Sequence, residues 1–384
     1  MKIFYWSPFI SYVATTYAVI NSIVAIKKFS KKKVNISLIN VASEWNDHIE
    51  KIQKENIKLI ELKKKKIDFK NLPKGNFIKS RITYFIVFFS SIFQLHRLLK
   101  EEKPKYLVIH LLSFIPMTLL LFFKYETKFI LRVSGYPRLN FLRSFFWKII
   151  NKKIYKVFCP TYLTKELLIN KKIFNKEKVF LVKDPIIEVN SLREKMKQSN
   201  LNTLIDKKYI LSIGRLTNQK NFNFLIDAFC EIHKKNPDLN LVICGNGEKK
   251  EDLMKLISQL KLNDKVKLIG FKDNIFPILH GAEFFVLTSN WEDPGFVIIE
   301  AMFAKKIVLT SNCPNGPKNI INDGVNGFKF EINDKKDFLN KFDEVSYLHL
   351  NEKNKVKKIL FNGIKTSRLY SLFNHYKDIS NHLV

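Results

Sequence analysis

Cysteine is scarce in this sequence: the 384 residues include four, and no two of them form a C-x-x-C pair. Two of the four, Cys230 and Cys244, stand in apolar surroundings. The sequence therefore predicts no disulfide framework and no zinc site, and it favours a reducing compartment.

Acidic residues are scarce in the first half of the chain. Residues 1–184 contain 36 Lys and Arg against 12 Asp and Glu, whereas residues 185–384 contain 30 against 23. The densest basic runs lie at 31–33, 63–66 and 152–153. Such a surface attracts anionic lipid, a phosphorylated acceptor or nucleic acid. A high-lysine background accounts for part of the total charge but not for its uneven distribution.

Uninterrupted hydrophobic runs of membrane-spanning length are also missing. Ile82–Leu95 is about 14 residues long, which is short for a span, and Tyr106–Phe123 is broken by His110, Ser113 and Pro116. We therefore expect no transmembrane helix. We expect instead a cytoplasmic protein on the inner face of the cytoplasmic membrane, because basic surfaces with nearby aromatic side chains attract anionic headgroups.

Strand-like and helix-like segments alternate twice along the chain, over residues 2–182 and again over 209–330. This alternation is typical of doubly wound parallel sheets, whose ligands bind beyond the carboxyl ends of the strands. We therefore predict an α/β protein in which two Rossmann-like domains face each other across a cleft. The predicted parts are a first domain over 1–186, a linker over 187–207, a second domain over 208–365 and a closing helix over 366–384.

Glycine is nearly absent from the first half, where only Gly75 and Gly135 occur. In the second half, glycines follow predicted strands at Gly214, Gly245 and Gly270. Because glycine lets the backbone approach a ligand closely, this distribution favours nucleotide binding in the second half. Ordinary turn chemistry is the alternative explanation.

Two glutamates eight positions apart, Glu292 and Glu300, belong to the most informative segment of the chain. Glu292 follows the predicted strand Phe284–Thr288, and Glu300 lies on the helix predicted to start near Phe296. The free first-turn amides of that helix, after Gly295, can bind an anion. The segment thus offers a carboxylate, a row of amides and a second carboxylate, which suits a sugar, a diphosphate and a ribose in that order.

Two cations, Arg215 and Lys220, flank a loop between a predicted strand and a predicted helix. The strand ends in Gly214, so both side chains are expected at its carboxyl end, where a diphosphate would lie. Arg binds phosphate through its planar fork and Lys as a point charge. The pair therefore suits a departing nucleoside diphosphate, although in a protein of net charge +31 only this position makes two cations informative.

The order and spacing of these pieces resemble glycosyltransferase family 4, which has the GT-B fold. The resemblance runs from Gly214 to Gly327, and in the first half it is one of architecture only. Residues 7–12 depart from the family's Gly-Gly loop, which points to a different acceptor. The matching segments are Gly214-Arg215-x4-Lys220-Asn221, Gly245-x-Gly247, Gly270-Phe271, Glu292-x7-Glu300-Ala301-Met302 and Asp323-Gly324-x-Asn326-Gly327.

The resemblance implies retaining transfer from a nucleotide sugar, usually UDP-linked, without a metal ion or other cofactor. It implies that Arg215 and Lys220 bind the donor diphosphate, that Glu300 binds the ribose hydroxyls, and that Glu292 binds the donor sugar. It also implies that the closing helix packs back on the first domain. Backbone amides facing the sugar or phosphate are implied at Gly295, Phe296 and Val297.

Two first-half segments are candidates for the acceptor side of the reaction. His110 follows a predicted strand, where it either lies near the primary hydroxyl of the sugar or makes a structural hydrogen bond beside a turn. The segment Arg132–Arg138 also follows a predicted strand. It is interpreted either as a loop that binds a lipid-linked diphosphate acceptor or as a purely structural loop.

We therefore predict a glycosyltransferase that moves a hexose or N-acetylhexosamine from a UDP-sugar to a lipid-linked, polysaccharide or lipopolysaccharide acceptor. The expected partners are the nucleotide sugar, an anionic glycan acceptor and the membrane surface, and no nucleic acid is expected. One alternative is a nucleotide-sugar hydrolase or epimerase that uses the same site. Another is a basic membrane- or nucleic-acid-binding protein with a relict site.

Overall fold

The computed structural model describes residues 1–9, 15–62, 77–197 and 208–383. The chain forms two compact units, each described here by itself: unit 1 is Met1–Pro185 with Leu372–Val384, and unit 2 is Ile186–Ser371. The lysine run at 63–66, residues 10–12 of the predicted acceptor-side turn and the linker from residue 198 onward lie outside the described residues.

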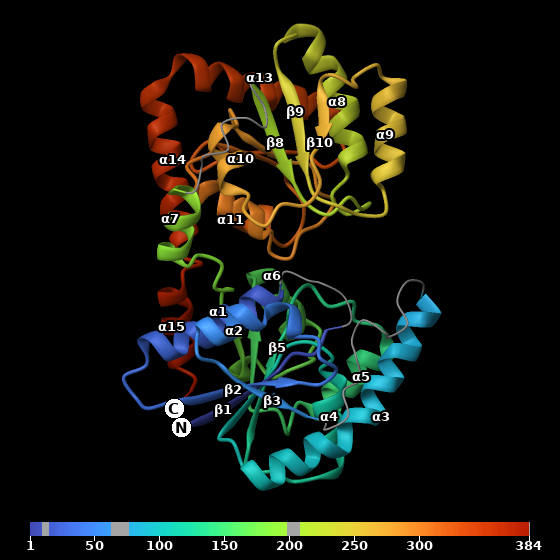
Figure 1. Cartoon of the computed structure of the whole chain (residues 1–384), viewed down its shortest axis with the longest axis vertical. Helices are drawn as coiled ribbons and strands as arrows, with labels where there is room; N and C mark the ends of the chain where they lie inside the picture. The colour runs from blue at the N-terminus through green and yellow to red at the C-terminus, as the bar shows by residue number, and fades with distance from the viewer. Residues whose placement is uncertain (10–14, 63–76, 198–207, 384) are drawn as a thin grey trace. The chain divides into compact units, whose positions relative to one another are not determined.

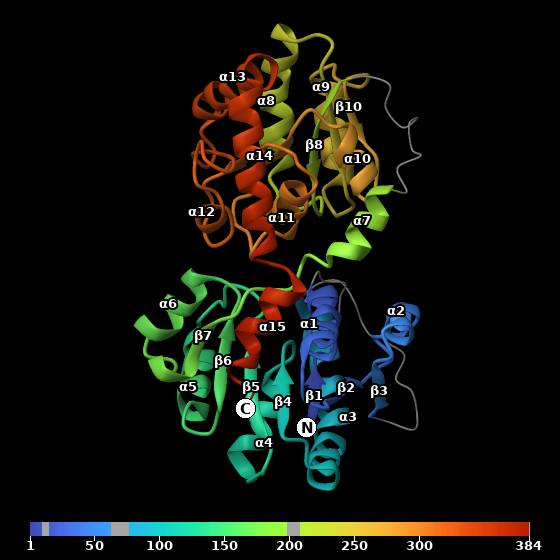
Figure 2. The ribbon, with the colours of Figure 1, turned by 90° about the vertical axis from the view of Figure 1, so that its left-hand side faces the viewer.

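The described part of unit 1 contains a seven-stranded parallel sheet with strand order β3-β2-β1-β4-β5-β6-β7 (Figures 1 and 2). Its strands are β1 (Lys2–Trp6), β2 (Asn35–Asn40), β3 (Lys58–Glu61), β4 (Tyr106–Ile109), β5 (Lys128–Arg132), β6 (Lys156–Cys159) and β7 (Val179–Leu181). Its helices are α1 (Thr15–Phe29), α2 (Ile49–Lys54), α3 (Phe77–Glu102), α4 (Phe114–Phe122), α5 (Phe141–Ile150), α6 (Tyr162–Asn170) and α15 (Leu372–Ser380).

Helices cover both faces of this sheet, with α1 and α15 on one face and α3, α4 and α5 on the other (Figure 1). The central strand β4 is accordingly apolar along its whole length, and every residue of it is buried. A continuous apolar run of this kind is what a parallel strand buried on both faces requires.

The last helix, α15, belongs to unit 1 and packs against α1. A buried hydrogen-bond chain joins the two helices to β1: Tyr5 Oη lies 2.9 Å from Ser22 Oγ, and Ser22 Oγ lies 2.8 Å from His375 Nε2. The sequence pattern predicts one closing helix over Thr366–Leu383, and this extent is wrong. The chain leaves the helix after Arg368 and starts a new one at Leu372.

Unit 2 contains a six-stranded parallel sheet with strand order β10-β9-β8-β11-β12-β13. Its strands are β8 (Tyr209–Ile213), β9 (Asn240–Cys244), β10 (Val266–Leu268), β11 (Phe285–Leu287), β12 (Val308–Ser311) and β13 (Phe328–Phe330). Its helices are α7 (Val189–Lys197), α8 (Phe222–Lys235), α9 (Lys250–Gln259), α10 (Phe276–Gly281), α11 (Phe296–Phe303), α12 (Pro317–Ile320), α13 (Lys335–Asn351) and α14 (Lys353–Arg368).

Alternating residues of β8 feed two separate hydrophobic cores, one on each face of the unit-2 sheet. Ile210 packs with the core that contains α8, α9 and α13. Leu211 and Ile213 pack with the core that contains α7, α10 and α11. This period of two fixes the register of the strand, and with it the place where the chain emerges at the carboxyl edge of the sheet.

The predicted doubly wound α/β class is therefore confirmed for each unit, and the differences lie in short elements. The sequence predictions omit α2, α7 and α12. Helix α7 occupies the first half of the segment predicted as a linker, and its Leu192 is buried against α10 in the core of unit 2. These helices have four to nine residues, and such short segments with few apolar positions give a weak periodic signal.

An ion pair at the carboxyl edge of the unit-1 sheet fixes the end of β5. The Arg132 side chain is buried and donates hydrogen bonds to the Asp184 carboxylate and to the Val182 carbonyl. Arg132 therefore connects β5 to the segment after β7. For Arg132 these contacts agree with the structural alternative, and acceptor binding by the rest of the segment to Arg138 stays a prediction.

Replacing Asp184 by Asn should destabilise unit 1 by about 3 kcal/mol, because the Arg132 charge would remain buried without its counter-charge. Urea unfolding followed by tryptophan fluorescence measures this well, since Trp6, Trp45 and Trp147 all lie in unit 1. The matched control is Asp343→Asn, which breaks an exposed pair with Lys235 and should cost less than about 1 kcal/mol. Equal stabilities of the two variants would contradict the structural role of Arg132.

Candidate functional site

The sequence-predicted site residues of the second half gather at the carboxyl edge of the unit-2 sheet. Gly214 follows β8 and Gly245 follows β9, and these strands are neighbours. Gly270 lies two residues after β10, and its carbonyl accepts a hydrogen bond from the Gly245 amide at 2.9 Å. Glu292 lies five residues after β11, which pairs with β8 on the other side. Neighbouring strand ends therefore bring together segments that are far apart in sequence.

The glycines after β8 and β9 pack directly against each other. A Cβ atom on Gly245 would lie 1.8 Å from the Gly214 carbonyl oxygen, and the φ of Gly245 is +150°. No side chain fits in this space, so glycine is required there for backbone packing as well as for conformation. The backbones of the two loops therefore lie in direct contact at these glycines.

Lys220 and Glu292 form a buried ion pair at the junction of the β8 and β11 loops. Lys220 Nζ lies 2.5 Å from Glu292 Oε1, and the two side chains are 12% and 5% exposed. The hydroxyl of Ser289 donates to the same carboxylate oxygen, also at 2.5 Å. The aliphatic stem of Lys220 lies over Gly214, where a Cβ atom would come within 2.8 Å of Lys220 Cε. Each partner is therefore held by both packing and charge.

The loop after β12 supports the turn that carries Glu292. A Cβ atom on Gly316 would lie 2.0 Å from the Pro294 carbonyl oxygen and 2.9 Å from Glu292 Cβ. The Asn315 amide donates a hydrogen bond to the Asp293 carboxylate. Glycine at position 316 thus permits the two loops to touch, and the contact restricts how far the Glu292 backbone can move.

Glu300 lies in the second turn of α11, and its side chain is half-buried. Burial raises the pKa of its carboxyl group to about 7, and the positive charge of Lys195 on α7 opposes this shift. Among the described residues, no hydrogen bond or ion pair to this carboxylate occurs. Glu300 is thus a poorly solvated carboxyl group with free acceptor positions, at the helix that follows Glu292.

The remaining predicted positions in unit 2 differ in exposure, and Gly295 is buried. The Arg215 side chain is exposed directly after Gly214. Gly295 precedes α11, and the half-buried residues Phe296 and Val297 form its first turn. The first amides of a helix have no acceptor within the helix. The site therefore combines an exposed guanidinium, a row of open amides and two carboxylates of different environments.

His110 belongs to unit 1, where it follows β4 and is buried. Its ring stacks on Tyr5, with 5.8 Å between the ring centroids. Burial, together with the nearby Arg132 charge, holds the pKa of His110 well below its usual value of 6.5. The imidazole is therefore neutral at neutral pH, and the proposed contact of His110 with a sugar hydroxyl stays a prediction.

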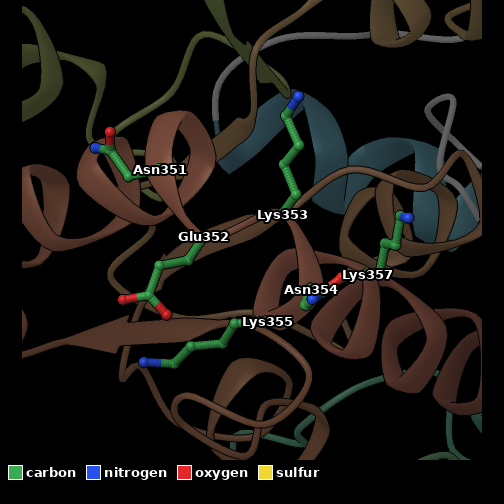
Figure 3. A pocket seen from close by; sticks show the side chains of 6 residues that line it. All are labelled: Asn351, Glu352, Lys353, Asn354, Lys355 and Lys357. Atoms are coloured by element: carbon green, nitrogen blue, oxygen red, sulfur yellow. The ribbon is translucent and has the colours of Figure 1, made fainter.

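A surface hollow at the turn between α13 and α14 contains none of the predicted site residues. It is lined by Asn351, Glu352, Lys353, Asn354, Lys355 and Lys357. Lys353 points away from Glu352 and Lys355, so these side chains do not converge on a common ligand position (Figure 3). We therefore base the site on the strand ends and not on this hollow.

Sequence reasoning missed three residues that shape the site. Ser289 carried a usable signal, because a hydroxyl directly after an apolar strand lies at the carboxyl edge of the sheet. Gly316 gave no clear signal, because ordinary turn chemistry also explains a glycine in a loop. Lys195 gave no signal, because it lies in a polar segment whose folding against unit 2 is not evident from its pattern.

The sequence of this chain is similar to those of known glycosyltransferases. Residues 193–359 match the family of glycosyl transferases, group 1. An uncharacterized glycosyltransferase of Methanocaldococcus jannaschii is 31% identical over 266 residues, which cover 64% of each chain. The Escherichia coli UDP-Gal:alpha-D-GlcNAc-diphosphoundecaprenol alpha-1,3-galactosyltransferase is 31% identical over 47% of this chain and 48% of its own. The chain thus matches less than two thirds of the length of these relatives.

Solved structures agree on the fold. The structure of Anabaena HepE in complex with UDP has a TM-score of 0.75 to this chain, with 14% sequence identity, and the alignment covers 100% of this chain and 99% of the other. At this identity the likeness concerns the fold alone, and it supports the GT-B architecture expected from the sequence. Together with the match over residues 193–359, it supports assignment of the chain to the group 1 glycosyl transferases.

Proposed function

We propose that this protein is a retaining glycosyltransferase that uses a UDP-sugar donor without a metal ion or cofactor. The observation that carries the proposal is the Lys220–Glu292 pair, set at neighbouring strand ends between exposed Arg215 and the open end of α11. The names of two similar proteins support the donor class, since one acts with UDP-Gal and the other was solved with UDP.

The site chemistry assigns a separate role to each charged group. Arg215 binds the donor diphosphate through its fork and, being exposed, makes the first contact. Lys220 adds a second positive charge on the leaving group, where charge builds up as the glycosidic bond breaks. The amides of Phe296 and Val297 bind phosphate or sugar oxygens. Glu300 accepts hydrogen bonds from the two ribose hydroxyls.

The pairing of Lys220 with Glu292 adds a coupling between sugar and diphosphate. In the free protein the two charges neutralise each other, so neither is left buried without a partner. When the donor binds, its diphosphate attracts the Lys220 ammonium. The Glu292 carboxylate can then accept a hydrogen bond from a sugar hydroxyl. Sugar binding and leaving-group stabilisation would then strengthen each other.

The acceptor in this proposal is a lipid-linked, polysaccharide or lipopolysaccharide glycan, reached at the cytoplasmic membrane surface. Support comes from the E. coli relative, whose printed name describes a diphosphoundecaprenol-linked acceptor, and from the basic excess of residues 1–184. A large anionic acceptor suits this charge better than water does. The hydrolase alternative predicts release of free sugar from the donor alone at full rate.

The decisive test measures binding of UDP, GDP and a UDP-hexose by calorimetry, and then sugar transfer to a lipid-linked diphosphate acceptor. Arg215→Ala should weaken UDP-hexose binding by about tenfold or more, because it removes a charge-assisted contact, with no change in melting temperature. Lys235→Ala, which removes an exposed cation of the same unit, serves as the matched control. Unchanged binding in Arg215→Ala, or steep salt-dependent RNA binding without affinity for UDP, would overturn the proposal.

The affinity for a UDP-sugar should decrease as the pH falls through about 7, the value to which burial raises the pKa of Glu300. Protonation removes acceptor capacity that the ribose hydroxyls need, so binding is strongest when the carboxylate is ionised above this pH. A UDP-sugar is the suitable probe, because the terminal phosphate of UDP itself titrates near pH 6. The Glu300→Gln variant should bind the UDP-sugar weakly at every pH. If the affinity of the wild-type protein does not change between pH 6 and pH 8, the proposed role of Glu300 in ribose binding is contradicted.

A further inference from the structure

Helix α3 exposes an apolar stripe on the surface of unit 1. Phe85, Phe89 and Phe93 recur every four residues, and they are 60%, 66% and 74% exposed. Ile82 and Ile86 lie beside them and are also exposed. Spacing of four places all these side chains on one face of the helix. The opposite face, which includes Val87, Leu95 and Leu99, is buried in the core of unit 1.

The apolar surface continues across α4 and α5. The ring centroids of Phe88 on α3 and Phe114 on α4 are 5.8 Å apart, and Phe114 is 4.7 Å from Phe146 on α5. The three helices lie next to each other on the same side of the unit-1 sheet (Figure 1). We call this area the aromatic face. Its most exposed members beyond α3 are Phe122, Phe141, Leu142 and Phe145.

Positive charge surrounds the aromatic face. Lys148 on α5 and Lys152 in the turn after this helix are exposed, three residues after Phe145 and Ile149 respectively. Residues 127–165 contain no Asp or Glu. On α3, Arg81 precedes the stripe and Arg97, which pairs with Glu101, follows it. A contiguous apolar patch with a basic border marks an interaction surface for an anionic, partly apolar partner.

From these observations we infer that the aromatic face is the surface through which unit 1 binds an anionic lipid bilayer. The phenylalanine rings enter the boundary between headgroups and acyl chains, and Lys148 and Lys152 bind anionic headgroups. The inference rests on the proposed membrane location and names the surface responsible for it. It does not depend on the donor site, which lies in unit 2.

The same helix has the length and composition of a membrane span over Arg81–Glu102. Crossing a bilayer would withdraw Val87, Leu95 and Leu99 from the core of unit 1, where they are buried. Lying at the interface keeps this packing and covers only the exposed stripe. The geometry therefore favours α3 as an interfacial helix.

Sedimentation of the full chain with vesicles tests the inference. Wild-type protein should bind vesicles of phosphatidylcholine with phosphatidylglycerol at least tenfold more tightly than vesicles of phosphatidylcholine alone, and high salt should release it. The double variant Phe93→Glu/Phe141→Glu should lose at least tenfold in affinity for the anionic vesicles. The charge variant Lys148→Glu/Lys152→Glu should lose a similar factor without any change to an apolar side chain.

The matched control is Phe361→Glu, an equally exposed phenylalanine on α14 of unit 2 (67% exposed), which should bind vesicles as wild type does. All variants should keep wild-type affinity for a UDP-sugar, so a failure of vesicle binding is separable from a failure of the donor site. Three results would overturn the inference: wild-type vesicle binding by both double variants, self-association through this face without vesicle binding, or retention that only detergent releases.

Discussion

The buried contact between Lys220 and Glu292 is the interaction on which the proposed site depends. Its two partners come from loops after adjacent strands, so the contact exists only because β8 and β11 are neighbours in the sheet. Removing either charge would leave the other buried alone, which costs about 3–5 kcal/mol in comparable pairs. The pair therefore fixes the position of two functional groups at once. In the proposed donor complex it also holds the ammonium in place for the diphosphate and the carboxylate in place for a sugar hydroxyl.

The surrounding structure limits how this pair can rearrange. Gly214 gives the Lys220 stem a surface to lie on, and Gly316 lets the loop after β12 press against the turn of Glu292. The Ser289 hydroxyl donates a hydrogen bond to one oxygen of the Glu292 carboxylate. Preorganised groups of this kind do not have to be ordered when the substrate binds, which is why such arrangements stabilise developing charge efficiently. Glu300, in the second turn of α11, keeps free acceptor positions.

The sequence was sufficient to predict the parallel sheets and to place the candidate residues of unit 2 at strand ends, and the reasons are physical. Buried parallel strands give continuous apolar runs, as in Phe285–Leu287, and the residue after such a run must lie at the carboxyl edge. Contacts between distant segments could not be predicted. The pattern did not show that Lys220 reaches Glu292, that the charge of Lys195 acts on the pKa of Glu300, or that Arg132 pairs with Asp184. Short helices such as α7 were missed because few apolar positions define them.

The central claim is that Lys220 and Glu292 act as one unit in binding the donor. A double-mutant cycle with Lys220→Met and Glu292→Gln, read out as UDP-sugar affinity, measures this coupling directly. We expect each single variant to bind the donor weakly. The loss of binding free energy in the double variant should be smaller than the sum of the two single losses, with a coupling energy of about 1 kcal/mol or more. Strictly additive effects, or wild-type affinity in both single variants, would contradict the account.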